Sequence, residues 1–291
     1  MPALPNAAFW SHAAKSAATV LLATISATSA PAQVSQNVDT SLLESWRLST
    51  GNVIRFCQYE TSPAFEFDQA VAQAIADSLL VSAEFLTLGA AYGIGGEYAA
   101  EDLFISLTND CDIMLGMGLG SDMYPVEFTT TRPYVGFPYV LAVADTEIES
   151  LDDIPGDRRI GALVGSYGFT ALMRYRATLP QDQQWQPLPY GDTELMITRV
   201  FDDTIAGMVV YGPSLVEYQR ETEIEGELFI RQLDAQIAAN VNIGGLMLAR
   251  NSYLRTIVDE AIGAMAEDGT IEALLAEYDL ASLQPAVGGY Q

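Results

Sequence analysis

The residues best placed for chemistry are hydroxyl and aromatic side chains in loops that follow the predicted central strands. They are Tyr59, Ser121, Tyr124, Ser166, Tyr167 and Tyr211, with Gly165 beside them. A tyrosine offers a ring face and one hydroxyl group, and a serine offers a hydroxyl group alone. Such groups favour a small ligand that is neutral, aromatic or sugar-like, bound by stacking and a few hydrogen bonds.

The tripeptide Gly165-Ser166-Tyr167 lies between a predicted strand and a predicted helix. Backbone N–H groups at the start of a helix accept an anion or a carbonyl oxygen, which would make this turn part of a binding site. Ser166 would serve equally well as the N-cap of its own helix. The sequence leaves both roles open.

The composition excludes several kinds of catalytic and metal site. The only histidine is His12 and the only lysine is Lys15, and both lie within the first 32 residues. A mature chain without them has no His-dependent triad, no histidine general base and no His-ligated zinc or copper site.

An enzyme such as a dehydratase would need a carboxylate in the cleft. The candidates are Glu60, Glu66 and Asp122. Each is more simply a solvated loop charge, so we predict no enzyme, no metal and no cofactor.

The first 32 residues predict a secretory signal peptide. A sparse basic start precedes the run SAATVLLATISATSA and a small-residue cleavage site that ends at Ala32. The run is shorter than a membrane span and is interrupted by Ser and Thr. No cysteine follows it, so we expect no lipoprotein anchor. These features predict export to the periplasm without membrane insertion.

The charge of the mature chain limits its partners. Removing Lys15 from the 13 basic residues leaves 12 against 38 acidic residues, a formal charge of −26. Such a field repels phosphate backbones and anionic lipid surfaces, which excludes nucleic-acid binding. The acidity fits either solubility or a basic protein partner, and the sequence does not separate the two. We expect a monomer.

Strand-like and helix-like segments alternate along the remaining chain. The expected strands are 52–59, 112–120, 139–145, 159–165, 205–213 and 241–251. The expected helices are 63–80, 101–110, 166–179, 192–204 and two within 252–280, broken at Asp268-Gly269. This alternation predicts an α/β fold of mainly parallel sheets flanked by helices, in two sets. The glycine-rich segment 89–98 follows no expected strand and is interpreted as a flexible loop, not a phosphate cradle.

In open α/β sheets the ligand crevice lies outside the carboxyl ends of the strands. The loops that follow the expected central strands are 58–66, 116–124, 165–168 and 210–214. The sequence therefore predicts that a ligand site is built from these four loops.

The two cysteines, Cys57 and Cys111, form an even pair in an exported chain, which favours a disulfide. Their places in the expected strands argue against it, because Cys57 is late in one strand and Cys111 is at the start of another. If these strands are parallel neighbours, about four residues at roughly 3.3 Å each would exceed the Cα reach of a bridge. The sequence leaves the disulfide open.

Taken together, these segments resemble the family 3 bacterial extracellular solute-binding proteins over nearly all of the predicted mature chain. The matching segments, in order, are EFDQAVAQAIADSL, CDIMLGMGLGSDMYPVEFTTTRPYVGFPYVLAV, SLDDIPGDRRIGALVGS, IAGMVVYGPSLVEY and IGGLMLARNSYLRTIVDEAIGAMAEDGTIEALLAEY. The resemblance implies two α/β lobes that close around a small ligand in the cleft between them. The first lobe would comprise 33–142 and 245–291, and the second 143–244. It also implies a non-enzymatic role, in which the ligand is presented to the permease of an ABC transporter.

Two positions depart from the members of that family that bind amino acids. Those members usually hold the ligand carboxylate with an arginine where this chain has Tyr124, and its ammonium with an aspartate where this chain has Tyr211. A tyrosine replaces neither, so the resemblance disfavours an ordinary amino acid as ligand. The alternative interpretation is that both tyrosines are packing residues at the cleft edge. Arg132 stands nearby and is interpreted as a support of its loop.

A narrower resemblance is to the periplasmic accessory proteins of quinoprotein (methanol) dehydrogenases. It rests on TTRPY at 130–134, on RFCQ paired with the later CD, and on IAGMVVYGP at 205–213. The loop 59–67 is short for that branch, and Val135 stands where a second tyrosine is usual. This branch implies an alternative function, in which the protein acts on the dehydrogenase by protein–protein interaction.

Overall fold

The computed structural model describes residues 52–89, 99–120, 123–221, 226–234 and 237–288. All of them belong to one compact unit, Val34–Gln291. The expected signal peptide, Ser121, Asp122 and most of the segment 89–98 lie outside the described residues. In the ranges that are described, no helix is both long and apolar enough to cross a membrane.

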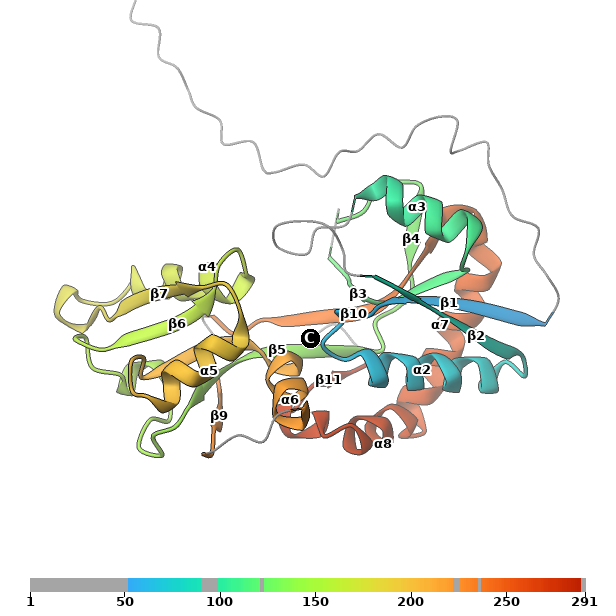
Figure 1. Cartoon of the computed structure of the whole chain (residues 1–291). Helices are drawn as coiled ribbons and strands as arrows, with labels where there is room; N and C mark the ends of the chain where they lie inside the picture. The colour runs from blue at the N-terminus through green and yellow to red at the C-terminus, as the bar shows by residue number, and fades with distance from the viewer. Residues whose placement is uncertain (1–51, 90–98, 121–122, 222–225, 235–236, 289–291) are drawn as a thin grey trace, which may run out of the picture. The chain divides into compact units, whose positions relative to one another are not determined.

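Strands of the described residues form a mixed sheet in the order β2-β1-β3-β10-β5-β8-β6-β7, as Figure 1 shows. The short strands β4 (Phe128–Thr130), β9 (Phe229–Gln232) and β11 (Ala286–Val287) pair beside this path. The path itself comprises β1 (Val53–Tyr59), β2 (Ser82–Leu88), β3 (Ile113–Gly118), β5 (Val135–Val143), β6 (Arg159–Leu163), β7 (Gln186–Tyr190), β8 (Gly207–Tyr211) and β10 (Asn240–Leu248).

The strand β5 joins two groups of strands. Its first half pairs with β10, from Val135 to Pro138, and its second half pairs with β8, from Tyr139 to Ala142. The outer ladders β1–β2, β1–β3, β6–β7 and β6–β8 are parallel, whereas the ladders of β5 and β10 are antiparallel. The expected α/β fold of sheets flanked by helices is therefore confirmed, with antiparallel strands where the two groups meet.

Helices cover both faces of the strands β1 and β3. The helix α2 (Phe65–Ser78) packs a stripe of Phe67, Val71 and Ile75 against one face, and α3 (Ala100–Asn109) lies on the other (Figure 1). The helices α7 (Ser252–Glu267) and α8 (Thr270–Glu277) adjoin α2. Between them Gly269 has a φ of 85°, which confirms the expected break.

The strands β6 and β8 carry their own helices. Ser166 caps α4 (Tyr167–Arg176), and Asp192 caps α5 (Thr193–Phe201), each through a side-chain oxygen that accepts a backbone N–H. The buried side chains of α4 and α5 belong to different apolar clusters, and Figure 1 shows the two helices on opposite faces of these strands.

The structure contains elements that the sequence did not predict. The strands β2 and β7 were missed because few of their side chains are buried, so they lack an apolar signature. Gly212 ends β8 as expected, but it also begins the helix α6 (Gly212–Glu221), with Pro213 in the first turn. Short 3₁₀ turns occur at Leu151–Asp153, Gln181–Gln183, Ala249–Asn251 and Leu280–Leu283.

A disulfide joins Cys57 and Cys111, whose Cα atoms are 5.6 Å apart. The strands β1 and β3 are indeed parallel neighbours, with Cys57 opposite Met114. The expected separation was too large because Cys111 is not part of β3. Its backbone N–H donates to Ser106 O at the end of α3, and this turn carries the cysteine to β1.

We expect the double substitution Cys57→Ala/Cys111→Ala to lower the free energy of unfolding by about 4 kcal/mol, because the bridge closes a loop with a sequence separation of 54. Urea unfolding of both proteins measures this change. Reductant should remove the difference by destabilising only the wild type. Equal unfolding curves without reductant would contradict a stabilising role for the bridge.

Candidate functional site

A cavity of about 170 Å³ lies at the carboxyl ends of β1 and β3, between the loop that leads into α2 and the joining strands. It receives side chains from both groups of strands, which makes it the candidate ligand site. Among the described residues, its lining contains no arginine or lysine. The lining residues are Ser62, Pro63, Ala64, Asp68, Gly116, Gly118, Tyr139, Tyr211, Val241 and Ile243.

The one charged residue of this lining, Asp68, is 1% exposed and belongs to a buried hydrogen-bond network. The hydroxyl of Tyr134 donates to Asp68 Oδ1 at 2.7 Å, and the hydroxyl of Ser62 donates to Oδ2 at 3.1 Å. Gln58 Nε2 lies 3.5 Å from the same Oδ2 and donates to Phe65 O at 2.7 Å. None of the ion pairs found among the described residues includes Asp68.

Burial raises the pKa of Asp68 from its ordinary 3.8 to about 7, although hydrogen bonds from Tyr134 and Ser62 act in the opposite direction. The pKa of Tyr134 is raised well above its ordinary value by its own burial and by the adjacent Asp68. The tyrosine therefore stays neutral, and Asp68 is the group of this pair that titrates near neutral pH.

An irregularity of the β3–β10 ladder at Gly116 brings β3 against this network. Its N–H donates to the hydroxyl of Tyr134 at 3.1 Å, so the tyrosine links β3 to Asp68. Gly116 has a φ of 70°, and a Cβ placed there would lie 2.6 Å from Asp68 Oδ2. Only glycine fits this backbone beside the carboxylate.

Two tyrosine rings form the other side of the cavity. The centroids of Tyr139 and Tyr211 are 5.6 Å apart, and Tyr211 also packs edge-on against Phe137 at 6.3 Å. Burial raises the pKa of Tyr139, while hydrogen bonds from the backbone N–H groups of Tyr167 and Gly168 act against that increase. The amides at the start of α4 therefore face the hydroxyl of Tyr139.

The backbone N–H groups at the start of α4 already have partners within the protein. Ser166 Oγ accepts from Phe169 N at 3.0 Å and donates to Leu163 O at 2.7 Å, so it is an N-cap. A Cβ at Gly168 would lie 2.9 Å from the ring of Tyr139, which explains why the ring can approach this turn so closely. An anion would have to compete with Tyr139 for these amides.

The structure brings together some of the predicted site residues. Tyr211 lines the cavity, and the ring of Tyr167 lies 5.7 Å from Tyr139 next to it. Gly165, with a φ of 77°, and Ser166 form the turn into α4. Ser121 lies outside the described residues.

Tyr59 and Tyr124 lie elsewhere and do not line the cavity. Tyr59 is buried in the apolar cluster around the disulfide, where Tyr124 also packs. The hydroxyl of Tyr124 donates to Gly118 O at 2.9 Å, and its ring contacts Phe128. In this structure Tyr124 thus holds the loop after β3, as in the packing interpretation.

Arg132 does not supply the missing cation. Its backbone N–H donates to Asp259 Oδ1 at 2.6 Å, and its guanidinium donates to Gly288 O at 3.3 Å. Both partners are remote from the cavity lining, in agreement with its interpretation as a support of the loop.

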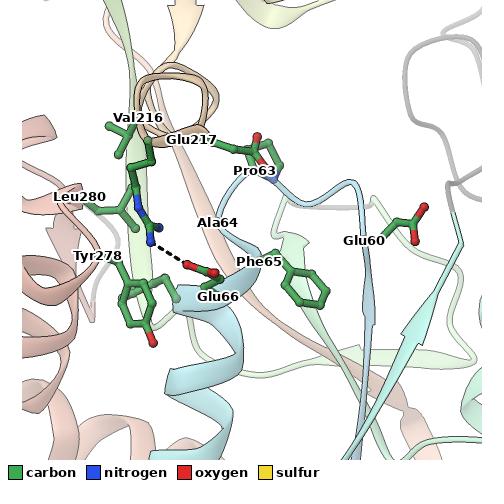
Figure 2. Close-up of a pocket in the computed structure, with 11 residues that line it drawn as sticks. Glu60, Pro63, Ala64, Phe65, Glu66, Val216, Glu217, Tyr278 and Leu280 are labelled. Atoms are coloured by element: carbon green, nitrogen blue, oxygen red, sulfur yellow. Dashed lines mark hydrogen bonds and ion pairs between the residues drawn. The ribbon is translucent and has the colours of Figure 1, made fainter. Parts of the chain in front are cut away.

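A second cavity, of about 380 Å³, adjoins Pro63 and Ala64 between α2, α6 and α8 (Figure 2). It contains two of the candidate acids. Glu66 is paired with Arg220 at 2.7 Å, whereas Figure 2 shows Glu60 apart from them near the end of β1. Arg220 also lies 5.7 Å from the ring centroid of Tyr278. Within the described residues, no group of three or more His, Cys, Asp or Glu side chains is arranged to hold a metal ion.

Several solved structures have a similar fold. Substrate-binding domain 2 of GlnP from Lactococcus lactis, in an open conformation, is 14% identical over 79% of this chain and 97% of that chain, with a TM-score of 0.62. The ancestral cationic amino acid solute-binding protein AncCDT-1 is 17% identical over 78% and 95%, with a TM-score of 0.60. The unliganded L-cystine solute receptor of Neisseria gonorrhoeae is 17% identical over 82% and 95%, with a TM-score of 0.58.

These likenesses show that the chain has the fold of substrate-binding domains. No family model matches the sequence, and no curated protein matches it. The ligand must therefore be argued from the cavity itself.

We expect the substitution Asp68→Asn to change how stability depends on pH. Because the pKa of Asp68 is higher in the folded than in the unfolded state, the contribution of Asp68 to wild-type stability falls as pH rises from about 4 to about 7. The variant lacks this loss, so its free energy of unfolding relative to wild type should rise by on the order of 4 kcal/mol across that interval.

Urea unfolding between pH 4 and pH 8 measures this difference. The control is Glu84→Gln, which removes an exposed carboxylate from β2 and should leave the pH profile parallel to that of the wild type. A profile for Asp68→Asn that also runs parallel to the wild type would show that Asp68 does not titrate as its burial implies.

Proposed function

We propose that this chain is a solute-binding protein whose cavity takes a small ligand other than an ordinary α-amino acid. The observation that carries the proposal is the lining of that cavity, which joins two groups of strands and contains no basic side chain among the described residues. An α-amino acid needs a partner for its carboxylate. The amides of α4 that could serve instead face the hydroxyl of Tyr139.

The proposed mechanism is closure of two lobes, 33–142 with 245–291 and 143–244, around the ligand. Two observations support it. The strand β5 changes its partner between Pro138 and Tyr139, which suits a hinge, and the pair Arg220–Glu66 connects α6 of the second lobe to α2 of the first. Both side chains of that pair are well exposed, so it adds little stability and would not prevent motion.

We further propose that the protein is exported to the periplasm after cleavage near Ala32 and delivers its ligand, as a monomer, to an ABC transporter. The disulfide Cys57–Cys111 supports an oxidising compartment. The neighbours in fold support a carrier over an enzyme, since their names describe substrate-binding domains and solute receptors.

The second candidate function is an accessory of a quinoprotein (methanol) dehydrogenase that acts by contact with that enzyme. The observation that favours it is the charge of −26 on the predicted mature chain, which suits a basic protein partner. In this role the cavity need not hold a ligand.

A thermal-unfolding screen of the chain from residue 33 onward tests the proposal. The panel comprises amino acids, sugars, small alcohols, organic acids, ammonium ions and quinone cofactors. A ligand at a hundred times its dissociation constant stabilises the folded state by about 2.7 kcal/mol, which raises the unfolding midpoint visibly. We expect a shift with one chemical class and none with free α-amino acids.

Tight binding of a free α-amino acid would contradict the ligand class that we propose. No shift with any compound, together with salt-sensitive binding to a purified quinoprotein dehydrogenase, would favour the accessory function instead.

A further inference from the structure

The cavity combines two features that select for positive charge. On one side lie the rings of Tyr139 and Tyr211, and the electron-rich faces of such rings attract cations within about 6 Å of their centroids. On the other lies Asp68, the only carboxylate among the described residues of the lining. The tyrosines alone suggested a neutral ligand, and Asp68 changes that expectation.

Among the described residues, no cation compensates the charge of an ionised Asp68. Its hydrogen-bond partners are the uncharged Tyr134, Ser62 and Gln58, and no basic side chain contributes to its pKa. A buried carboxylate without a cation is costly, and a cation placed in the adjoining cavity would recover part of that cost.

The described lining offers no cation to a negative group. It has no arginine or lysine, and the backbone N–H groups of Tyr167 and Gly168 face the hydroxyl of Tyr139. A volume of about 170 Å³, well under the roughly 300 Å³ at which pockets for drug-sized ligands begin, suits a compact molecule.

We propose that the cavity binds a compact organic ammonium ion without a carboxylate group, which stacks on Tyr139 and Tyr211 and is neutralised by Asp68. This inference rests on the proposed function, since it names the ligand class of the same site.

Binding of such a cation is coupled to a proton. At pH 6 Asp68 is mostly protonated, so the cation displaces the proton from its carboxyl group into the solvent. The titratable groups that interact with Asp68 are Tyr134, before β5, and Tyr211 on β8, and the pKa of each is raised well above 10. From β1 and β3, Gln58 and Gly116 lie against Asp68, and neither residue titrates. Glu66, which is on α2 with Asp68, is paired with Arg220.

Isothermal titration calorimetry tests the ligand class with tetramethylammonium, n-butylammonium and choline as probes. Two matched compounds serve as controls: the uncharged isostere of choline, in which carbon replaces the ammonium nitrogen, and glycine betaine, which adds a carboxylate. We expect at least one cation to bind more than tenfold tighter than either control compound. Because tetramethylammonium and choline do not titrate, any pH dependence of their affinity reports on the protein.

Between pH 8 and pH 6 the affinity should fall about tenfold, and titrations in buffers of different ionisation heat should show about one proton released per cation at pH 6. Asp68→Asn should weaken binding more than tenfold and abolish both the pH dependence of the affinity and the proton release. Tyr211→Leu should weaken binding but keep the proton release, and Glu84→Gln should bind as the wild type does.

The remaining outcomes separate the two proposals. If a neutral compound binds and no ammonium ion does, the cation inference is wrong and the solute-binding function stands. If Asp68→Asn binds a cation as tightly as the wild type does, the assigned role of Asp68 is wrong. If no compound in either panel binds, the solute-binding function fails together with the inference.

Discussion

Among the described residues the carboxyl group of Asp68 is buried without a cationic partner, and much of the local structure satisfies it. Tyr134 and Ser62 give it hydrogen bonds, and the chain must hold both groups at fixed distances for the network to exist. Tyr134 in turn accepts the N–H of Gly116, which fixes the irregular stretch of β3 beside the cavity. One buried carboxyl group therefore ties together the loop after β1, the irregularity in β3 and the residue before β5.

The ligand preference that we propose for this site follows from how the protein uses its own polar groups. A carboxylate ligand would need an arginine or the amides that begin α4. Tyr124 donates to Gly118 O, and the amides of α4 face the hydroxyl of Tyr139. The described lining thus offers no cationic partner to an anion, whereas Asp68 lies on the cavity wall as the proposed partner for cations. On this proposal the site would discriminate through the groups that it withholds as much as through those that it offers.

Much of the fold could be predicted from the sequence, since apolar periodicity depends on local spacing. That signal located α2, α7, α8 and the buried strands, but it failed for β2 and β7, whose side chains are largely exposed. The cavity was harder to predict because its parts are brought together by contacts distant in sequence, such as Tyr134 with Asp68. One sequence signal was available for Asp68. It lies in register with Val71 and Ile75 on the buried stripe of α2, where an acid requires partners.

The strand β5 has a consequence for how the molecule unfolds. Of its nine residues, the first half pairs with β10 and β11, and the second half pairs with β8 and β9. Melting of this strand would expose the edges of both groups of strands at once, so neither group can lose it and keep its own pairing. The shared strand should make unfolding cooperative across the two groups, even though each has helices of its own. The strand at which we propose that the molecule bends is therefore also the one that holds its two groups of strands together.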